Sequence, residues 1–232
     1  MKIRLILLPG MHGTGELFSE FMRMMSEPKH IEALQYPPDV GPSYPQSLAV
    51  VQAFVPESGP YFLLAESFST PLAIQFAATH PQNLKGLILA AGFASSPVGG
   101  LRRSLASLLA PILFHLPVPQ VAVDYILIGR NAPESLKQSV RTVISSIRPR
   151  VMAARLRAVL ACDVRADLSK VVVPMLYIRA TRDRLVPRNC LEEIQAVMPR
   201  TKVVELYGPH LILQREPKQS AEVVMRFIEE TL

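Results

Sequence analysis

The 232-residue chain has no tryptophan, only two cysteines and no long uninterrupted apolar run. Cys162 and Cys190 match neither the spacing of a metal site nor that of a disulfide framework, so we expect free thiols in a reducing compartment. A helix that crosses a bilayer needs about 20 apolar residues in succession. Basic residues are not interleaved with aromatic ones, which argues against nucleic-acid binding. We therefore expect a cytoplasmic protein with no stable membrane anchor.

The apolar N-terminal stretch 1–10 has some features of a secretion signal. Its apolar run is short, Arg4 interrupts it, and Pro9-Gly10 ends it without a cleavage-site pattern. We interpret residues 3–8 as the first strand. With 49% hydrophobic and 19% charged residues, the chain is typical of one globular unit with room for an inserted subdomain.

Strand-like and helix-like segments alternate over much of the chain, which predicts βαβ units and a parallel sheet. The expected strands are 3–8, 31–36, 61–65, 84–91, 171–178 and 202–206. The expected helices are 16–26, 46–54, 67–80, 188–198 and 216–232.

The alternation stops between residues 95 and 163. Apolar residues recur there at helical spacing, in a segment around residues 101–116 and in two further helices, 133–147 and 151–161. We predict a helical cap at 95–163, inserted into a core made of residues 1–94 and 164–232.

A sharp turn is predicted at Ala65-Glu66-Ser67-Phe68-Ser69, between an apolar strand and a helix. Such a turn exposes one side chain, Ser67, and leaves the N–H of Phe68 free at the start of the helix. A serine at this place can also be a simple helix cap. The pattern alone does not decide between the two.

A serine hydroxyl becomes nucleophilic when a histidine takes its proton and a carboxylate orients that histidine. Asp183 follows an apolar strand and precedes a Val-Pro pair that leads into a helix. His210 follows the last strand and precedes the last helix. Each could instead be an ordinary loop residue. The other histidines fit this pattern less well.

These motifs resemble those of the α/β-hydrolase family, in which serine, acid and histidine follow one another on loops after strands. The resemblance covers nearly the whole chain. It implies Ser67 as nucleophile, Asp183 and His210 as its partners, and an α/β fold with a six-stranded, mainly parallel sheet in the order 2-1-3-4-5-6. The family's additional edge strands are expected to be missing, because the chain begins at the strand that precedes the oxyanion loop.

The same resemblance places the oxyanion loop at residues 8–13, with the backbone N–H groups of Met11 and Phe68 as donors. His12 is expected to shape this loop and contact substrate. The implied activity is that of a serine carboxylesterase with an acyl-enzyme intermediate. The acyl pocket is expected to include apolar cap residues, namely Leu105, Leu109, Ile112 and Phe114.

No metal and no cofactor is expected, since the sequence has no cluster of metal ligands and no phosphate-binding glycine loop. Other activities remain open on this scaffold, namely those of a thioesterase, a lactonase or a cofactor-free lyase. A ligand-binding protein without turnover is a further alternative.

Positive charge is concentrated in the predicted cap, which holds nine basic and three acidic residues and so accounts for the whole formal charge of +6. An arginine-rich face suits an anionic partner or substrate. The chain is similar in size and motifs to the pimeloyl-acyl-carrier-protein methyl ester esterases of biotin biosynthesis. That similarity implies an acidic acyl carrier protein as partner, with Arg148 and Arg155 as contacts. A plain solvated face and an anionic membrane surface are the alternatives.

Overall fold

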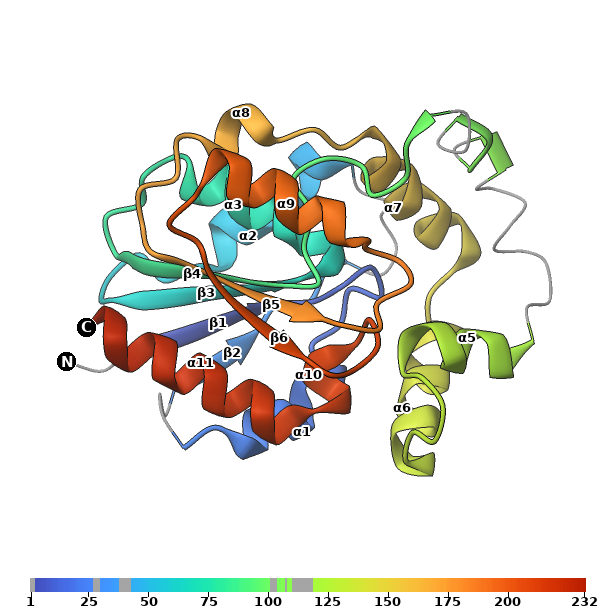
Figure 1. Cartoon of the computed structure of the whole chain (residues 1–232). Coiled ribbons are helices and arrows are strands. Elements are labelled where there is room, and N and C mark those ends of the chain that lie inside the picture. The colour runs from blue at the N-terminus through green and yellow to red at the C-terminus, as the bar shows by residue number, and fades with distance from the viewer. Residues whose placement is uncertain (1–2, 27–29, 38–42, 101–103, 107, 110–118) are drawn as a thin grey trace.

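A computed structural model describes residues 3–26, 30–37, 43–100, 104–106, 108–109 and 119–232. Its centre is a six-stranded, all-parallel sheet in the order β2-β1-β3-β4-β5-β6 (Figure 1). The predicted sheet and strand order are confirmed. The strands are β1 (Arg4–Leu8), β2 (His30–Ala33), β3 (Tyr61–Glu66), β4 (Leu84–Ala90), β5 (Met175–Ala180) and β6 (Lys202–Leu206).

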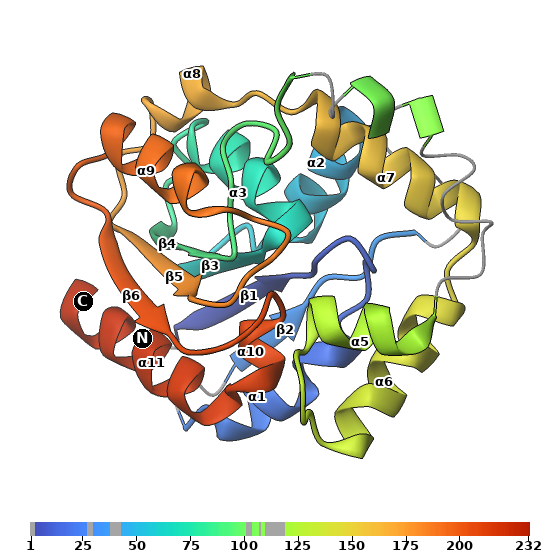
Figure 2. The same ribbon diagram turned by 45° about the vertical axis from the view of Figure 1, so that its right-hand side comes forward.

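Helices cover both faces of the sheet (Figures 1 and 2). One face carries α2 (Tyr44–Phe54), α3 (Thr70–Ala77), α8 (Arg165–Leu168) and α9 (Arg188–Val197). The other face carries α1 (Ser19–Met24), α10 (Ile212–Arg215) and α11 (Pro217–Thr231). Single-turn 3-10 helices, η1 (Glu16–Phe18) and η2 (Ser67–Ser69), precede α1 and α3.

The alternation of side chains along the strands explains the two cores. In β1, Leu5 and Leu7 belong to the core under α1 and α11, whereas Ile6 and Leu8 belong to the core under α2 and α3. All four are fully buried. A strand that is apolar at every position is typical of a parallel sheet covered on both sides.

Three helices lie in the predicted insertion, namely α5 (Gln120–Leu127), α6 (Glu134–Ser145) and α7 (Pro149–Ala161). Residues 104–106 and 108–109 are also helical, and the rest of the helix expected around 101–116 lies outside the described residues. An antiparallel bridge joins Ser95 to Asp163, the two ends of the predicted cap. The division into core and cap stays a prediction. No helix in the described ranges is long and apolar enough to span a bilayer.

Several element boundaries differ from the sequence expectation. The second strand begins at His30 and ends at Ala33, three residues before its predicted end at 36. The fifth strand begins at Met175 rather than at residue 171, because Pro174 has no N–H to contribute to a strand ladder. The helix after the elbow ends at Ala77, before His80, which has a positive φ of 56°.

Replacement of Phe62 tests how much the core below α11 contributes to the free energy of unfolding. Its ring is fully buried, and it meets Phe227 edge-on at a centroid distance of 6.1 Å. We predict that Phe62→Ala lowers the free energy of unfolding by about 3–5 kcal/mol, because it removes buried apolar surface and leaves a cavity. Urea denaturation measures this change. Val172→Ala, at an exposed position, serves as the control and should change it by less than about 0.5 kcal/mol.

Candidate active site

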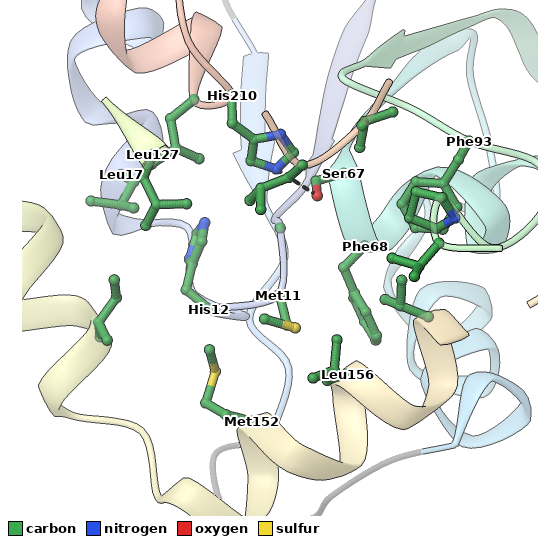
Figure 3. A pocket seen from close by; sticks show the side chains of 18 of the residues that line it. Met11, His12, Leu17, Ser67, Phe68, Phe93, Leu127, Met152, Leu156 and His210 are labelled. Atoms are coloured by element: carbon green, nitrogen blue, oxygen red, sulfur yellow. Dashed lines mark hydrogen bonds between the residues drawn. The ribbon is translucent and has the colours of Figure 1, made fainter. Parts of the chain in front are cut away.

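Four loops meet at the carboxyl end of the sheet, where β1, β3, β5 and β6 finish. The parallel strands are in register, with Leu8 opposite Ala65 and Ala180 opposite Leu206. Loops that leave the carboxyl ends of neighbouring parallel strands come together at one edge of a sheet. Residues far apart in sequence are thereby gathered around Ser67 (Figure 3).

Ser67 occupies a strained turn. Its φ is +48°, in the left-handed region that side chains other than glycine rarely adopt. The turn joins β3 directly to η2, and the hydroxyl of Thr70 donates a hydrogen bond to the Ser67 carbonyl at 2.8 Å. This conformation holds the Ser67 hydroxyl beyond the end of the strand, as the sequence predicts for a nucleophile.

Ser67, His210 and Asp183 form a continuous hydrogen-bonded chain. His210 Nε2 lies 2.8 Å from Ser67 Oγ, and His210 Nδ1 lies 2.8 Å from Asp183 Oδ2. The other carboxylate oxygen, Asp183 Oδ1, accepts from the N–H groups of Leu185 at 2.8 Å and Val186 at 3.0 Å. The structure thus brings together the three residues that the sequence selected for catalysis.

The pKa values of the pair move in opposite directions. Burial by itself raises the pKa of Asp183, but the His210 charge and the hydrogen bonds lower it below its usual value. Burial by itself lowers the pKa of His210, but Asp183, through its charge and hydrogen bond, and Glu66, through its charge, raise it above its usual value. The site therefore favours the imidazolium that would form when His210 takes the proton of Ser67.

The predicted oxyanion donors face the same place. Phe68 is the second residue of η2, where N–H groups have no acceptor within the helix. Met11 lies in the turn after β1, in which Gly13 N–H donates to the Gly10 carbonyl at 2.9 Å. Within the described chain, the Met11 N–H donates to no other backbone group. Both residues line the cavity at Ser67.

Ser69 links the turn at Ser67 to the loop after β1. Its hydroxyl donates to the carbonyl of Pro9 and accepts from the hydroxyl of Tyr36, 2.8 Å away. Burial raises the pKa of Tyr36, which keeps this phenol protonated and able to donate. The sequence placed Ser69 in the sharp turn but did not predict that it bridges this turn to the loop after β1.

The prediction that Arg155 contacts a partner protein is wrong, because the side chain is buried. Only 1% of its surface is exposed, so a docking protein cannot reach it. It extends from α7 under the oxyanion loop, and its Nη1 donates to the carbonyls of Met11 at 2.9 Å and His12 at 3.0 Å. The sequence did contain a signal, because residues 151, 155 and 159 share one helix face, on which Val151 and Val159 are apolar.

The fit around Arg155 is tight. A Cβ atom at Gly13 would lie 2.3 Å from Arg155 Nη1, and the φ of Gly13 is +78°. The guanidinium also lies over the ring of Tyr36, with 5.8 Å between the guanidinium carbon and the ring centroid. We conclude that Arg155 holds the predicted oxyanion loop in place and connects it to α7.

A second histidine and carboxyl group lie beside Ser67. His12 Nδ1 accepts from the N–H of Thr14 at 3.3 Å, which places the ring proton on Nε2, 3.7 Å from Glu66 Oε2. Glu66 is fully buried, and its Oε2 accepts from Gln214 Nε2 at 3.3 Å. His12 lines the cavity, and its expected roles in shaping the loop and contacting substrate stay predictions.

The cavity above Ser67 has a volume of about 200 Å³ and is lined mainly by apolar side chains. Those from the cap include Leu127, Val140, Ile144, Met152, Leu156 and Val159. Figure 3 shows Met152 and Leu156 projecting from α7 toward Met11 and Phe68. Among the residues that the structure describes, no group of three or more His, Cys, Asp or Glu side chains could hold a metal ion.

The predicted acyl-pocket residues lie elsewhere. Leu105 and Leu109 are 49% and 50% exposed and are not among the residues lining the cavity. Ile112 and Phe114 lie outside the described residues. The sequence identified the cap as apolar but could not tell which of its helices faces Ser67. The structure assigns that position to α7, α6 and the end of α5. Arg148 is exposed at the start of α7, and its partner contact stays a prediction.

Replacement of Arg155 by methionine tests the positioning role. Arg155→Met leaves the Met11 and His12 carbonyls without their donor, so we expect a loss of about 1–3 kcal/mol in the free energy of unfolding. For any ester hydrolysed by Ser67, kcat should fall about tenfold or more with little change in KM, because oxyanion donors act on the transition state. Arg157→Met, at an exposed position of the same helix, is the control. Equal kcat values for the two variants would contradict this role.

The pH dependence of hydrolysis tests the electrostatics. Only neutral His210 can accept the Ser67 proton, so kcat/KM should rise with pH, with a midpoint above about 6.5, the usual value for histidine. Glu66→Gln removes a negative charge that favours the imidazolium and should move this midpoint to lower pH. Glu229→Gln, which removes an exposed carboxylate of α11, should leave it in place. Coincident profiles for both variants and the parent would exclude the contribution of Glu66.

Comparison with known proteins finds hydrolases and esterases similar to this chain. The "Putative carbamate hydrolase RutD" of Caulobacter vibrioides is 26% identical over 163 residues, which cover 67% of this chain and 60% of that protein. This chain thus spans about three fifths of that relative's length. The "Pimeloyl-[acyl-carrier protein] methyl ester esterase" of Aliivibrio salmonicida is 25% identical over 225 residues, 89% of this chain and 84% of that protein.

Among solved structures, MenH from S. aureus matches with a TM-score of 0.83 at 14% identity, covering 100% of this chain and 95% of that one. At that identity the match concerns the fold. The family model for "Serine aminopeptidase, S33" matches residues 46–213, which include Ser67, Asp183 and His210. The chain therefore belongs to this S33 family of hydrolases and has the α/β-hydrolase fold.

Proposed function

We propose that the protein is a serine hydrolase that cleaves carboxylic esters through an acyl-enzyme intermediate. The observation that carries this proposal is the Ser67–His210–Asp183 chain, with both contacts at 2.8 Å, at the base of an apolar cavity. A nucleophile, a base and an orienting carboxylate in this geometry are what acyl transfer requires.

In the acylation step, Ser67 Oγ forms a bond to the ester carbonyl carbon while its proton passes to His210 Nε2. The carbonyl oxygen takes the negative charge and accepts hydrogen bonds from the N–H groups of Met11 and Phe68. The bond to the alkoxy oxygen then breaks, and His210 returns the proton so that the alcohol leaves neutral. Asp183 stabilises the imidazolium throughout this step.

In the deacylation step, water takes the place of the alcohol. His210 accepts a proton from the water as its oxygen attacks the acyl carbon, and the same two N–H groups hold the second oxyanion. The ester bond to Ser67 breaks, His210 protonates Ser67 Oγ, and the carboxylic acid is released. Over the two steps, one ester and one water give one alcohol and one carboxylic acid, and no other reactant is needed.

The apolar lining favours a hydrocarbon acyl chain as the part of the substrate inside the cavity. We further propose a methyl ester of a carrier-bound acyl chain as one candidate substrate, with an acidic acyl carrier protein as partner. The likeness to the Aliivibrio salmonicida esterase and the basic character of the cap support this candidate. The proposed contact for such a partner is the exposed Arg148, whereas the buried Arg155 cannot reach a partner.

A series of p-nitrophenyl esters, from acetate to longer chains, tests the proposed reaction. We expect hydrolysis with an optimum beyond acetate, because longer chains bury more apolar surface in the cavity. Ser67→Ala should lower kcat by at least about a thousandfold, since the nucleophile is lost. Initial rates of p-nitrophenolate release give both quantities.

Ser104→Ala is the control, because this exposed serine of the cap lies away from the cavity lining. Hydrolysis that persists in Ser67→Ala would contradict the proposed nucleophile. Turnover of thioesters or lactones in preference to all oxygen esters would keep the nucleophile and replace the substrate class. Absence of turnover on every acyl substrate, despite saturable binding of apolar esters, would favour a binding protein.

A further inference from the structure

A second hollow lies at the junction of cap and core, outside the apolar cavity. It is formed by the end of α5, the loop after β5 and the loop after β6. Its lining includes Tyr125, Arg130, Arg182, Arg184, Tyr207 and Arg215. Four of its twelve lining residues are arginines and one, Glu216, is acidic, whereas the cavity at Ser67 has no arginine in its lining.

The three segments are fixed to one another. The N–H of Leu211 donates to the carbonyl of Leu127 at 2.9 Å, and the N–H of Arg182 donates to the carbonyl of Gly208 at 2.8 Å. Gly129 lies next to Pro209, because a Cβ atom built at Gly129 would lie 3.4 Å from the Pro209 ring, at van der Waals distance. Figures 1 and 2 both show α5 beside the loop that leads into α10. The backbone segments that carry the arginines are therefore held in place by hydrogen bonds within the protein.

Three of the guanidinium groups make cation–π contacts with tyrosine rings and are not paired with any described carboxylate. Arg184 lies 4.1 Å from the ring centroid of Tyr125 and donates to its hydroxyl at 2.6 Å. Arg130 lies 5.1 Å from the centroid of the same ring. Arg182 lies 5.3 Å from the centroid of Tyr207. In the described part of the chain, none of these three arginines forms an ion pair with a carboxylate.

Many other surface cations are neutralised by a carboxylate. Examples are Arg23 with Glu20, Arg165 with Asp163, Lys170 with Asp167, Arg179 with Glu205 and Arg188 with Glu192. As far as the described ranges show, Arg215 alone among the arginines of the hollow has such a partner, Glu216 at 3.5 Å. Like charges gathered at one place repel one another unless an anion joins them. Stacking on a ring also leaves most guanidinium N–H groups free to donate in their own plane.

We propose that this hollow is a binding site for a phosphate group. A carboxylate is satisfied by one guanidinium in a two-bond contact. A phosphate monoester carries close to two negative charges and three acceptor oxygens, which matches three guanidiniums without acids. The binding does not depend on the ester hydrolysis proposed above, so Ser67→Ala protein should bind with the same affinity.

Isothermal titration of the 232-residue protein with glycerol phosphate, at fixed ionic strength, tests the site. We expect saturable binding that weakens about tenfold or more in the double variant Arg182→Gln/Arg184→Gln. The matched control, Arg165→Gln/Arg188→Gln, removes the same charge from ion-paired surface positions. It should change the dissociation constant by less than about twofold.

Absence of saturable binding of the parent protein to both glycerol phosphate and vesicles containing phosphatidic acid, or equal weakening in both double variants, would overturn the proposal. Thermal melting confirms that each variant is folded. Arg130→Gln, whose described contact is ring stacking alone, provides a milder second test and should also weaken binding. Vesicles containing phosphatidic acid separate the two sources of the group. Arginine-dependent binding to vesicles but not to glycerol phosphate would assign the site to lipid headgroups, and the reverse result to a soluble phosphate monoester.

Discussion

The conformation of Ser67 is the constraint on which the site depends. A left-handed backbone at a residue with a side chain costs about 1–3 kcal/mol and persists only when its surroundings enforce it. Three groups do so here. Thr70 binds the Ser67 carbonyl, Tyr44 donates to the Phe68 carbonyl at 3.2 Å, and Ser69 ties the turn to the loop after β1. Strain at Ser67 is thus balanced by hydrogen bonds that involve α2, α3 and the loop after β1.

The sheet and the three predicted catalytic positions could be read from the sequence because both follow from local rules. Apolar runs of strand length identify parallel strands, and parallel strands deliver their loops to one edge. Ser67, Asp183 and His210 each follow such a run, so their convergence required no side-chain detail. The acyl pocket was not predictable in the same way. Which cap helix faces Ser67 depends on packing between helices, and the exposed Leu105 and Leu109 have the same periodicity as a buried face.

Arginine serves three different purposes in this chain, and composition could not separate them. Arg165 is neutralised by neighbouring carboxylates, Arg155 is buried against backbone carbonyls, and Arg184 is stacked on a tyrosine. A charge count treats the three as equal contributions to a basic surface. Burial distinguishes them, since a guanidinium removed from water must have its donors satisfied. Arg155 was placed on a partner surface because its helix is rich in arginine, although its helix face is apolar.

The attachment of α7 to the oxyanion loop restricts how substrate can enter. A lid that opened by swinging α7 outward would withdraw the Arg155 guanidinium from the Met11 and His12 carbonyls. Each opening would then disturb the loop that carries the predicted oxyanion donor Met11 and leave two backbone carbonyls without a donor. Substrate can therefore enter and product can leave without disturbing this loop only if α7 stays in place.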